Sequence, residues 1–169
     1  LNKTLEERAK IEERNKKLVE AQGNAMKVNA LVASNAAKAN YAALESAKGL
    51  PKGLLSAVNM TESPNSNTAR SSAGARGAFQ FMPKTAERFN VDVNSVNSSA
   101  KGAAEYLDKL LKMFEGNLEN ALRAYNWGEG NMQNYLKYGS GMKNGQKGYF
   151  ADRPMPKETR EYPGKVMGY

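Results

Sequence analysis

The sequence predicts a mainly α-helical fold, and three observations support this prediction. Apolar residues recur at helical spacing in short segments, and loops rich in Gly, Asn and Ser separate these segments. The strict alternation of apolar and polar residues that is typical of strands is scarce. The chain has 169 residues and is 40% apolar, so it can bury a core and is not a wholly disordered polymer.

Composition divides the chain near residue 48. Residues 1–48 are rich in Lys, Glu, Ala and Asn and contain no proline, whereas residues 49–169 contain all the prolines and every glycine except Gly23. We therefore expect a helical leader or linker over 1–48 and a folded domain over 49–169.

Within the leader, small apolar residues recur every seven positions, as expected for one face of a helix. The repeat consists of Ile11, Leu18, Ala25, Val32 and Ala39. Because the stripe is only weakly apolar, we expect a solvated helix, or a helix pair broken at Gly23 and Asn24. Such a segment would pack on the domain or link it to a larger protein.

Residues 49–169 contain six helix patterns with recognisable ends. Proline suits the first turn of a helix, Ser and Asn cap its start, and Gly or a Ser-Pro pair ends it. The expected helices run from near Pro51 to Glu62, from about Pro83 to Phe89, from a cap at Ser98 or Ser99 to Gly116, from an Asn117 cap to Tyr125, from Asn131 to Tyr138, and from Lys157 to about Tyr162. The glycine-rich stretch 139–157 predicts a surface loop.

The residue types that are missing limit the chemistry. The chain has no cysteine and no histidine, which excludes disulfides, thiol nucleophiles, zinc fingers and histidine general bases. Carboxylates, hydroxyls, amides and lysines remain. No apolar stretch approaches the roughly 20 residues of a membrane-spanning helix, so we expect no membrane span.

Charge indicates an anionic partner. The formal net charge is +8, which favours nucleic acid, a membrane surface or an acidic wall polymer. Lys and Arg are spread along the chain and do not cluster with aromatic residues. We therefore expect no binding to nucleic acid.

Glu62 is the candidate for acid chemistry. It follows Leu54 and Val58 at four-residue spacing, so it lies on the apolar side of a helix, and Ser63 and Pro64 end that helix. Partial burial and the negative end of the helix dipole would both raise its pKa, as a general acid requires. The alternative is an exposed glutamate at a frayed helix end.

Four sequence blocks occur in order over residues 50–163. They are Glu62-Ser63; an S-x-x-G-A-x-G segment that starts at Ser71 and leads into Q-x-M-P-x-T-A from Gln80; Y-N-x-G-x-G from Tyr125; and E-T-R-x-Y from Glu158. The ordered set resembles the soluble lytic transglycosylase family of peptidoglycan-cleaving enzymes, and in particular its phage virion-associated members. The resemblance implies a lysozyme-like helical domain of the goose-type and lytic transglycosylase kind, with 49–169 as the catalytic domain.

By matched position, the resemblance makes Glu62 the catalytic acid and base. It places Ser71, Gln80, Tyr125 and Glu158 along the glycan cleft, with Asn126 bracing the same wall, and it directs the Tyr125 hydroxyl toward the sugar or toward Glu62. Structural alternatives remain: Ser71 as a turn hydroxyl, Gln80 as a cap of a neighbouring helix, and Glu158 as an ion-pair partner of Arg160 or another cation. Many relatives carry a small residue at the position of Trp127, which we expect to anchor the core or a loop.

The family mechanism needs one glutamate and no metal or organic cofactor. The glutamate protonates the oxygen between N-acetylmuramic acid and N-acetylglucosamine and then removes the proton of the sugar's 6-hydroxyl, which closes a 1,6-anhydro ring. One alternative is a goose-type muramidase, with water as the acceptor. Another is a non-catalytic glycan-binding module of a virion or secretion apparatus.

The implied partner is the glycan strand of peptidoglycan. We expect a virion-associated protein that opens the wall locally from the host periplasm, with a bacterial periplasmic enzyme as the alternative. In the first setting, residues 1–48 would contact other proteins of the virion or of a secretion apparatus.

Overall fold

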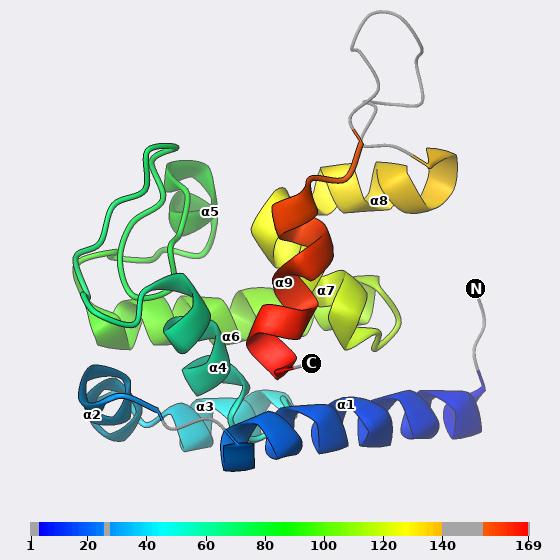
Figure 1. Ribbon diagram of the computed structural model, residues 1–169, viewed down its shortest axis with the longest axis horizontal. Helices are drawn as coiled ribbons and strands as arrows, with labels where there is room; N and C mark the ends of the chain where they lie inside the picture. The colour runs from blue at the N-terminus through cyan, green and yellow to red at the C-terminus, as the bar shows by residue number, and fades with distance from the viewer. Residues whose placement is uncertain (1–3, 26–27, 140–153, 169) are drawn as a thin grey trace, which may run out of the picture.

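The computed structural model describes residues 4–25, 28–139 and 154–168, and nine helices form its regular structure there (Figure 1). This confirms the mainly α-helical prediction. In chain order the helices are α1 (Leu5–Ala25), α2 (Ala30–Lys38), α3 (Tyr41–Lys48), α4 (Leu54–Glu62), α5 (Pro83–Arg88), α6 (Val96–Met113), α7 (Leu118–Trp127), α8 (Glu129–Tyr138) and α9 (Lys157–Met167).

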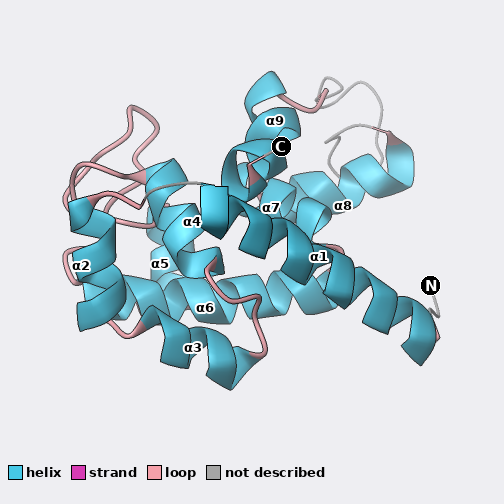
Figure 2. Cartoon of the chain, turned by 60° about the horizontal axis from the view of Figure 1, so that its bottom comes forward, coloured by secondary structure: helices cyan, strands magenta, loops and turns pink. Residues whose placement is uncertain are grey.

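Helix α6 runs through the middle of the molecule, and α7 links it to α8 and α9 (Figure 1). Helix α4 packs against α9 and α6, and it also contacts α2 and α3. Helix α1 runs along one side of the body, where it contacts α9 and α4 (Figures 1 and 2). The fully buried side chains at the centre come from several helices and one loop: Leu54, Leu55, Val58, Phe79, Leu107, Leu110, Leu118 and Leu122.

All three helices within residues 1–48 pack against helices that follow them, and α3 shows how. Tyr41 of α3 is buried and stacks at a tilt against Phe79, with 5.6 Å between ring centroids. The buried carboxylate of Glu45 accepts hydrogen bonds from the backbone N–H groups of Gly53 (3.0 Å) and Leu55 (2.8 Å). Because Gly53 has no side chain to cap α4, Glu45 satisfies these N–H groups from outside the helix.

Several helix ends differ from the sequence-based expectation. Helix α1 includes Gly23 and Asn24, so the expected break at these residues is wrong. Ser95 caps α6 by accepting from the Ser98 N–H at 3.1 Å, because the Ser98 hydroxyl instead accepts from the Asp92 N–H. The Asn117 cap of α7 is confirmed.

Helix α9 continues past its expected end near Tyr162. It passes through Pro163, which cannot donate the hydrogen bond to the preceding turn. Val166 and Met167 beyond the proline are buried, so core packing offsets the lost bond. Helix α8 begins at Glu129, two residues before the expected start. Of the expected loop 139–157, residues 140–153 lie outside the described part of the chain.

Gly102 allows α6 to pass close to a neighbouring segment. A Cβ atom at this position would lie 2.2 Å from Cγ2 of Val91, although Gly102 has ordinary helical geometry. Alanine is generally preferred to glycine inside a helix, but the close contact with Val91 requires glycine at position 102.

We predict that Gly102→Ala destabilises the fold by about 1–3 kcal/mol through overpacking against the stiff Val91 side chain. Gly130→Ala in α8 is the matched control, because nothing lies within 4 Å of a Cβ placed there, and it should be neutral or stabilising. Urea unfolding of both variants measures the difference. Equal stability of the two variants would contradict the prediction.

Candidate active site

Glu62 is the last residue of α4, and a buried asparagine one turn earlier fixes this helix end. The Asn59 amide donates to the backbone carbonyls of Ser63 (3.2 Å) and Ala78 (3.1 Å). Its oxygen accepts from the Tyr41 hydroxyl at 2.8 Å and from the Asn35 amide at 3.1 Å. The end of α4 is thereby tied to α2, to α3 and to the loop that carries Ala78.

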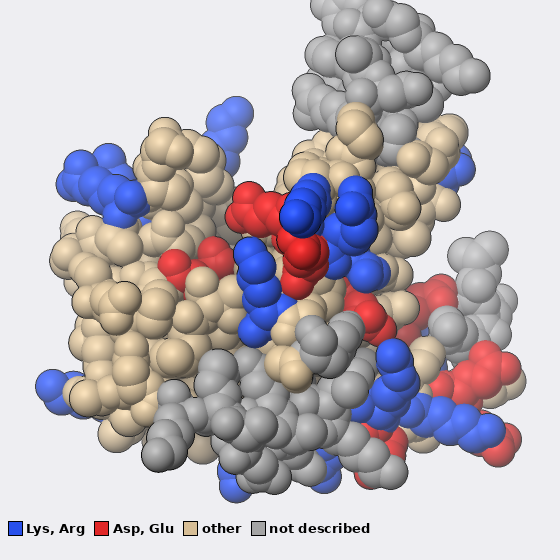
Figure 3. All heavy atoms as spheres, in the orientation of Figure 1, with Lys and Arg blue, Asp and Glu red and all other residues tan. Residues whose placement is uncertain are grey.

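The loop between α4 and α5 folds back on itself. The Ser63 hydroxyl donates to the Ser66 carbonyl at its start, and two isolated antiparallel bridges, Arg70 with Arg76 and Arg76 with Phe81, order the rest. Gly77 is required here, because it has a φ of +83° and a Cβ would lie 2.5 Å from the Val93 carbonyl oxygen. Figure 3 shows a hollow between the lobe formed by this loop with α5 and the charged side chains of α9.

Helix α9 supplies the direct partner of Glu62. The buried Tyr162 hydroxyl donates to Oε2 of Glu62 at 3.0 Å, a contact between residues 100 positions apart. Exposed Glu158 lies one turn earlier on α9 and accepts from the Asn126 amide at 3.1 Å. The Thr159 hydroxyl donates to the Asn126 oxygen at 2.7 Å, so Asn126 joins α7 to α9.

The environment of Glu62 raises its pKa to about 7. Burial is the main cause, and the negative charge of Glu158 adds to it, whereas the Tyr162 hydrogen bond and the positive charge of Lys165 act in the opposite direction. A carboxyl group with this pKa can both donate and accept a proton near neutral pH. The expectation of a raised pKa at this position is confirmed.

The structure brings together Glu62, Asn126 and Glu158 but gives Tyr125 a different partner. The Tyr125 hydroxyl donates to the Phe79 carbonyl at 2.7 Å and not to Glu62, although burial and, next to it, the negative charge of nearby Glu62 raise the pKa of Tyr125. The Tyr125 ring stacks on that of Tyr162, with 6.5 Å between centroids and 15° between planes. Both phenols lie at the α7–α9 contact, and the one on α9 reaches the carboxylate.

Gln80 and Ser71 hold the loop in shape. Gln80 has a φ of +52°, and its amide donates to the carbonyls of Ala69 (3.1 Å) and Gly77 (2.8 Å) within its own loop, not to a helix end. The exposed Ser71 hydroxyl accepts from the Ala75 N–H at 2.9 Å, as a turn hydroxyl does. Trp127 is partly buried against the core and contacts Tyr135 edge to face.

Tyr162 and Asn59 are the site residues that sequence reasoning missed. Tyr162 follows Glu158 by four residues, so both lie on one face of α9, and this spacing could have indicated its role. Asn59 is polar in an otherwise apolar stripe of α4, and such a residue is buried only where hydrogen bonds satisfy it.

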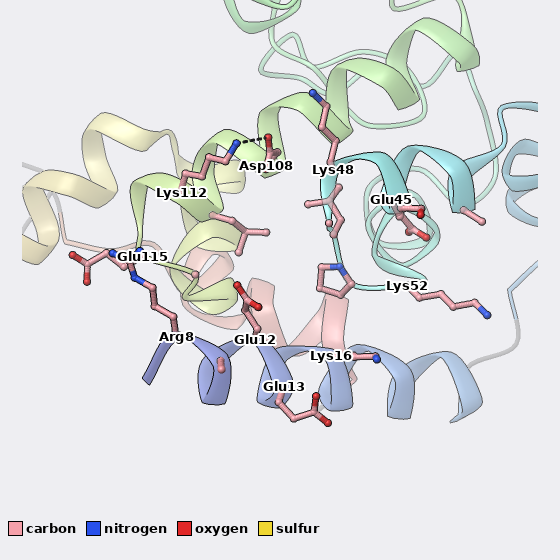
Figure 4. A pocket seen from close by; sticks show the side chains of 18 residues that line it. Arg8, Glu12, Glu13, Lys16, Glu45, Lys48, Lys52, Asp108, Lys112 and Glu115 are labelled. Carbon is pink, nitrogen blue, oxygen red and sulfur yellow. Dashed lines mark hydrogen bonds and ion pairs between the residues drawn. The ribbon is translucent and has the colours of Figure 1, made fainter. Parts of the chain in front are cut away.

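A separate cavity lies between α1, α3 and α6 (Figure 4). Its volume is about 1370 Å³, and its lining contains acidic and basic side chains in equal number. Neither Glu62 nor any residue bonded to it lines this cavity. Among the described residues, no group of three or more acidic side chains could hold a metal ion, and no helix is long and apolar enough to cross a membrane.

Comparison with known proteins identifies the family. Residues 39–146 match the family model described as Transglycosylase SLT domain, and the chain belongs to this family. Membrane-bound lytic murein transglycosylase D from two Escherichia coli strains is 31% identical over 106 residues, which are 59% of this chain and 23% of the relative. The expected resemblance to the lytic transglycosylase family is thus confirmed.

Among solved structures, the X-ray structure of an inactive mutant of lytic transglycosylase Slt from Pseudomonas aeruginosa is similar, with a TM-score of 0.56 and 25% identity. The match covers 76% of this chain and 22% of the relative. The expected lysozyme-like helical fold is confirmed. The chain spans less than a quarter of the length of the relatives that it matches.

We predict that Tyr162→Phe raises the pKa of Glu62 further, because the lost hydrogen bond stabilises the carboxylate. Carbon-13 NMR titration of labelled glutamate side chains measures this pKa. Tyr125→Phe is the control, since its hydroxyl bonds to the Phe79 carbonyl and not to Glu62. A pKa that rises equally in both variants, or in neither, would contradict the assignment.

We also predict that Glu62→Gln is more stable than the unchanged chain by roughly 1–3 kcal/mol above pH 7. The folded pKa of about 7 exceeds the ordinary 4.5, so the stability contributed by Glu62 falls as pH rises through this window. Below pH 4.5 the difference should vanish. Urea unfolding below pH 4.5 and above pH 7 measures the stability difference between the two proteins. Exposed Glu161→Gln is the control and should not be stabilised above pH 7.

Proposed function

We propose that this chain is a peptidoglycan lytic transglycosylase that uses Glu62 as acid and then as base. It would cleave the β-1,4 bond between N-acetylmuramic acid and N-acetylglucosamine and release 1,6-anhydro ends. The observation that carries the proposal is a partly buried carboxyl with a pKa of about 7 at the end of α4, in a chain of the SLT family. The relatives are named lytic transglycosylases, and the similar solved structure is an inactive mutant of such an enzyme.

The geometry around Glu62 supports this use of one carboxyl. Tyr162 donates to Oε2 at 3.0 Å, so Oε1 is the oxygen that would act on the substrate. Protonated Glu62 would donate its proton to the bridging oxygen as the glycosidic bond breaks. The carboxylate that forms keeps the Tyr162 hydrogen bond, which favours the charged form, and would then accept the proton of the 6-hydroxyl.

In this proposal the other predicted site residues support the cleft. Asn126 and Glu158 would form the α9 wall, because Asn126 holds the Glu158 carboxylate and the Thr159 hydroxyl together. Gln80 and Ser71 would line the opposite wall on the loop that they keep in shape. Tyr125 would support this wall through the Phe79 carbonyl.

A muramidase that uses water as the acceptor is the second candidate, and Glu158 favours it. Glu158 is close enough to Glu62 to raise its pKa, and inverting glycosidases use a second carboxylate to activate water. However, Glu158 is exposed and its Oε1 already accepts from Asn126, so we prefer the mechanism with one carboxyl.

For the biological setting we propose local wall opening by a phage particle in the host periplasm, with a bacterial periplasmic enzyme as the alternative. The resemblance of the sequence blocks to phage-encoded transglycosylase domains supports the first setting. Residues 1–48 would then contact other proteins of the particle, and most of the described side chains in the first half of α1 are exposed.

We predict that the chain releases muropeptides with 1,6-anhydro ends from purified sacculi and that Glu62→Gln releases none. Mass spectrometry of the soluble products distinguishes the candidates, because reducing-end products are heavier by one water and would indicate a muramidase. Glu161→Gln, an exposed change on α9, should release products as the unchanged chain does. Retained binding to sacculi without release from any variant would indicate a non-catalytic module.

A further inference from the structure

Two arginines on the loop between α4 and α5 have no role in the chemistry described above. Backbone hydrogen bonds from Ser71 N–H to the Ala75 oxygen and from Gly77 N–H to the Ala69 oxygen, both 2.9 Å, flank Arg70 and Arg76. This pattern makes Arg70 and Arg76 directly opposed residues of a non-hydrogen-bonded antiparallel pair. In such a pair the Cα atoms are about 4.5 Å apart and the side chains lie close together.

Two positive charges in this arrangement repel each other. Both side chains are exposed, and within the described residues neither guanidinium group has a hydrogen bond or an ion pair. Like charges directly opposite on a β pair are destabilising, so the arrangement has a cost in the free protein. An anion bound by both guanidinium groups would remove this cost, and each group can bind a carboxylate through two N–H donors.

The arginine pair belongs to the lobe that borders the hollow. Figure 3 shows basic side chains gathered at the outer end of the loop, on the lobe that faces α9 across the hollow. The same loop is tied to the helix of Glu62 by the bond from Asn59 to Ala78 and by the bond from Ser63 to Ser66. The loop that carries the pair is therefore held in a fixed position relative to Glu62.

We propose that Arg70 and Arg76 bind carboxylates of the stem peptides that peptidoglycan carries on its muramic acid residues. This proposal rests on the proposed function and specifies its substrate as peptide-bearing glycan. Where a peptide is attached, the lactyl carboxyl of muramic acid is in an amide bond, so the anionic groups lie on the peptides. Because these peptides project from the strand, their carboxylates can reach an exposed basic pair on the loop that borders the hollow.

Binding tests the proposal without cleavage when every protein carries Glu62→Gln. The probes are peptide-bearing glycan strands and the same strands after an amidase has removed the peptides. Arg70→Gln with Arg76→Gln should weaken binding to the peptide-bearing strands roughly 3- to 10-fold. Removal of the peptides frees the lactyl carboxyls, so binding to the stripped strands should weaken only as much as it does in the charge-matched control. The control is Lys38→Gln with Lys109→Gln, an equal change in charge at exposed lysines of α2 and α6, which should not discriminate between the strands.

An equal loss on both kinds of strand, or no loss on either, would overturn the proposal. Product release by the chain with Glu62 intact tests the proposed function separately. If no products form but the difference in binding persists, the proposed enzymatic function is wrong and the role of the arginine pair stands. If products form but binding shows no such difference, only the role of the arginine pair is wrong.

A second measurement excludes a merely structural role. Arg76→Gln removes the repulsion, so its melting temperature should equal or exceed that of the unchanged chain while binding to peptide-bearing strands weakens. A lowered melting temperature would show that Arg76 stabilises the loop and would overturn the proposal.

Discussion

The buried side chain of Asn59 holds together the parts of the structure on which the candidate site depends. It joins α2 and α3, through Asn35 and Tyr41, to the end of α4 and to the Ala78 carbonyl of the following loop. Loss of these hydrogen bonds would leave buried polar groups without partners, the Tyr41 hydroxyl among them, so the connection is costly to break. Helices that precede residue 49 thus help to fix Glu62, and one of them, α3, lies within the family match that begins at residue 39.

The environment that raises the pKa of Glu62 also lowers the stability of the folded state. Burial against the core raises its pKa to about 7, so the folded state is less stable above that pH than it would be with a neutral side chain. Tyr162 limits the rise by donating to the carboxylate. The same balance suits a group that must hold a proton and then accept one. The opposed arginines of the loop would likewise lower the stability of the free protein through their repulsion, and a bound anion would relieve that repulsion.

Local signals predicted most helices, and they failed where packing decides the end of a helix. The Asn117 cap and the start of α5 at Pro83 follow from side-chain chemistry within one turn. The end of α9 does not, because buried Val166 and Met167 continue the helix beyond Pro163. Likewise Ser98 is chemically able to cap α6, but its hydroxyl accepts from Asp92, and Ser95 takes its place.

The sequence by itself determined the helical class, the family and the acidic residue at the end of an apolar helix, because these depend on spacing along the chain. Only the tertiary structure decided which phenol meets Glu62. Tyr125 and Tyr162 stand in equally recognisable sequence blocks, and both are aromatic residues at the contact of α7 and α9. The choice of Tyr162 follows from how α9 crosses α4, a packing arrangement between segments 100 residues apart that no local pattern encodes.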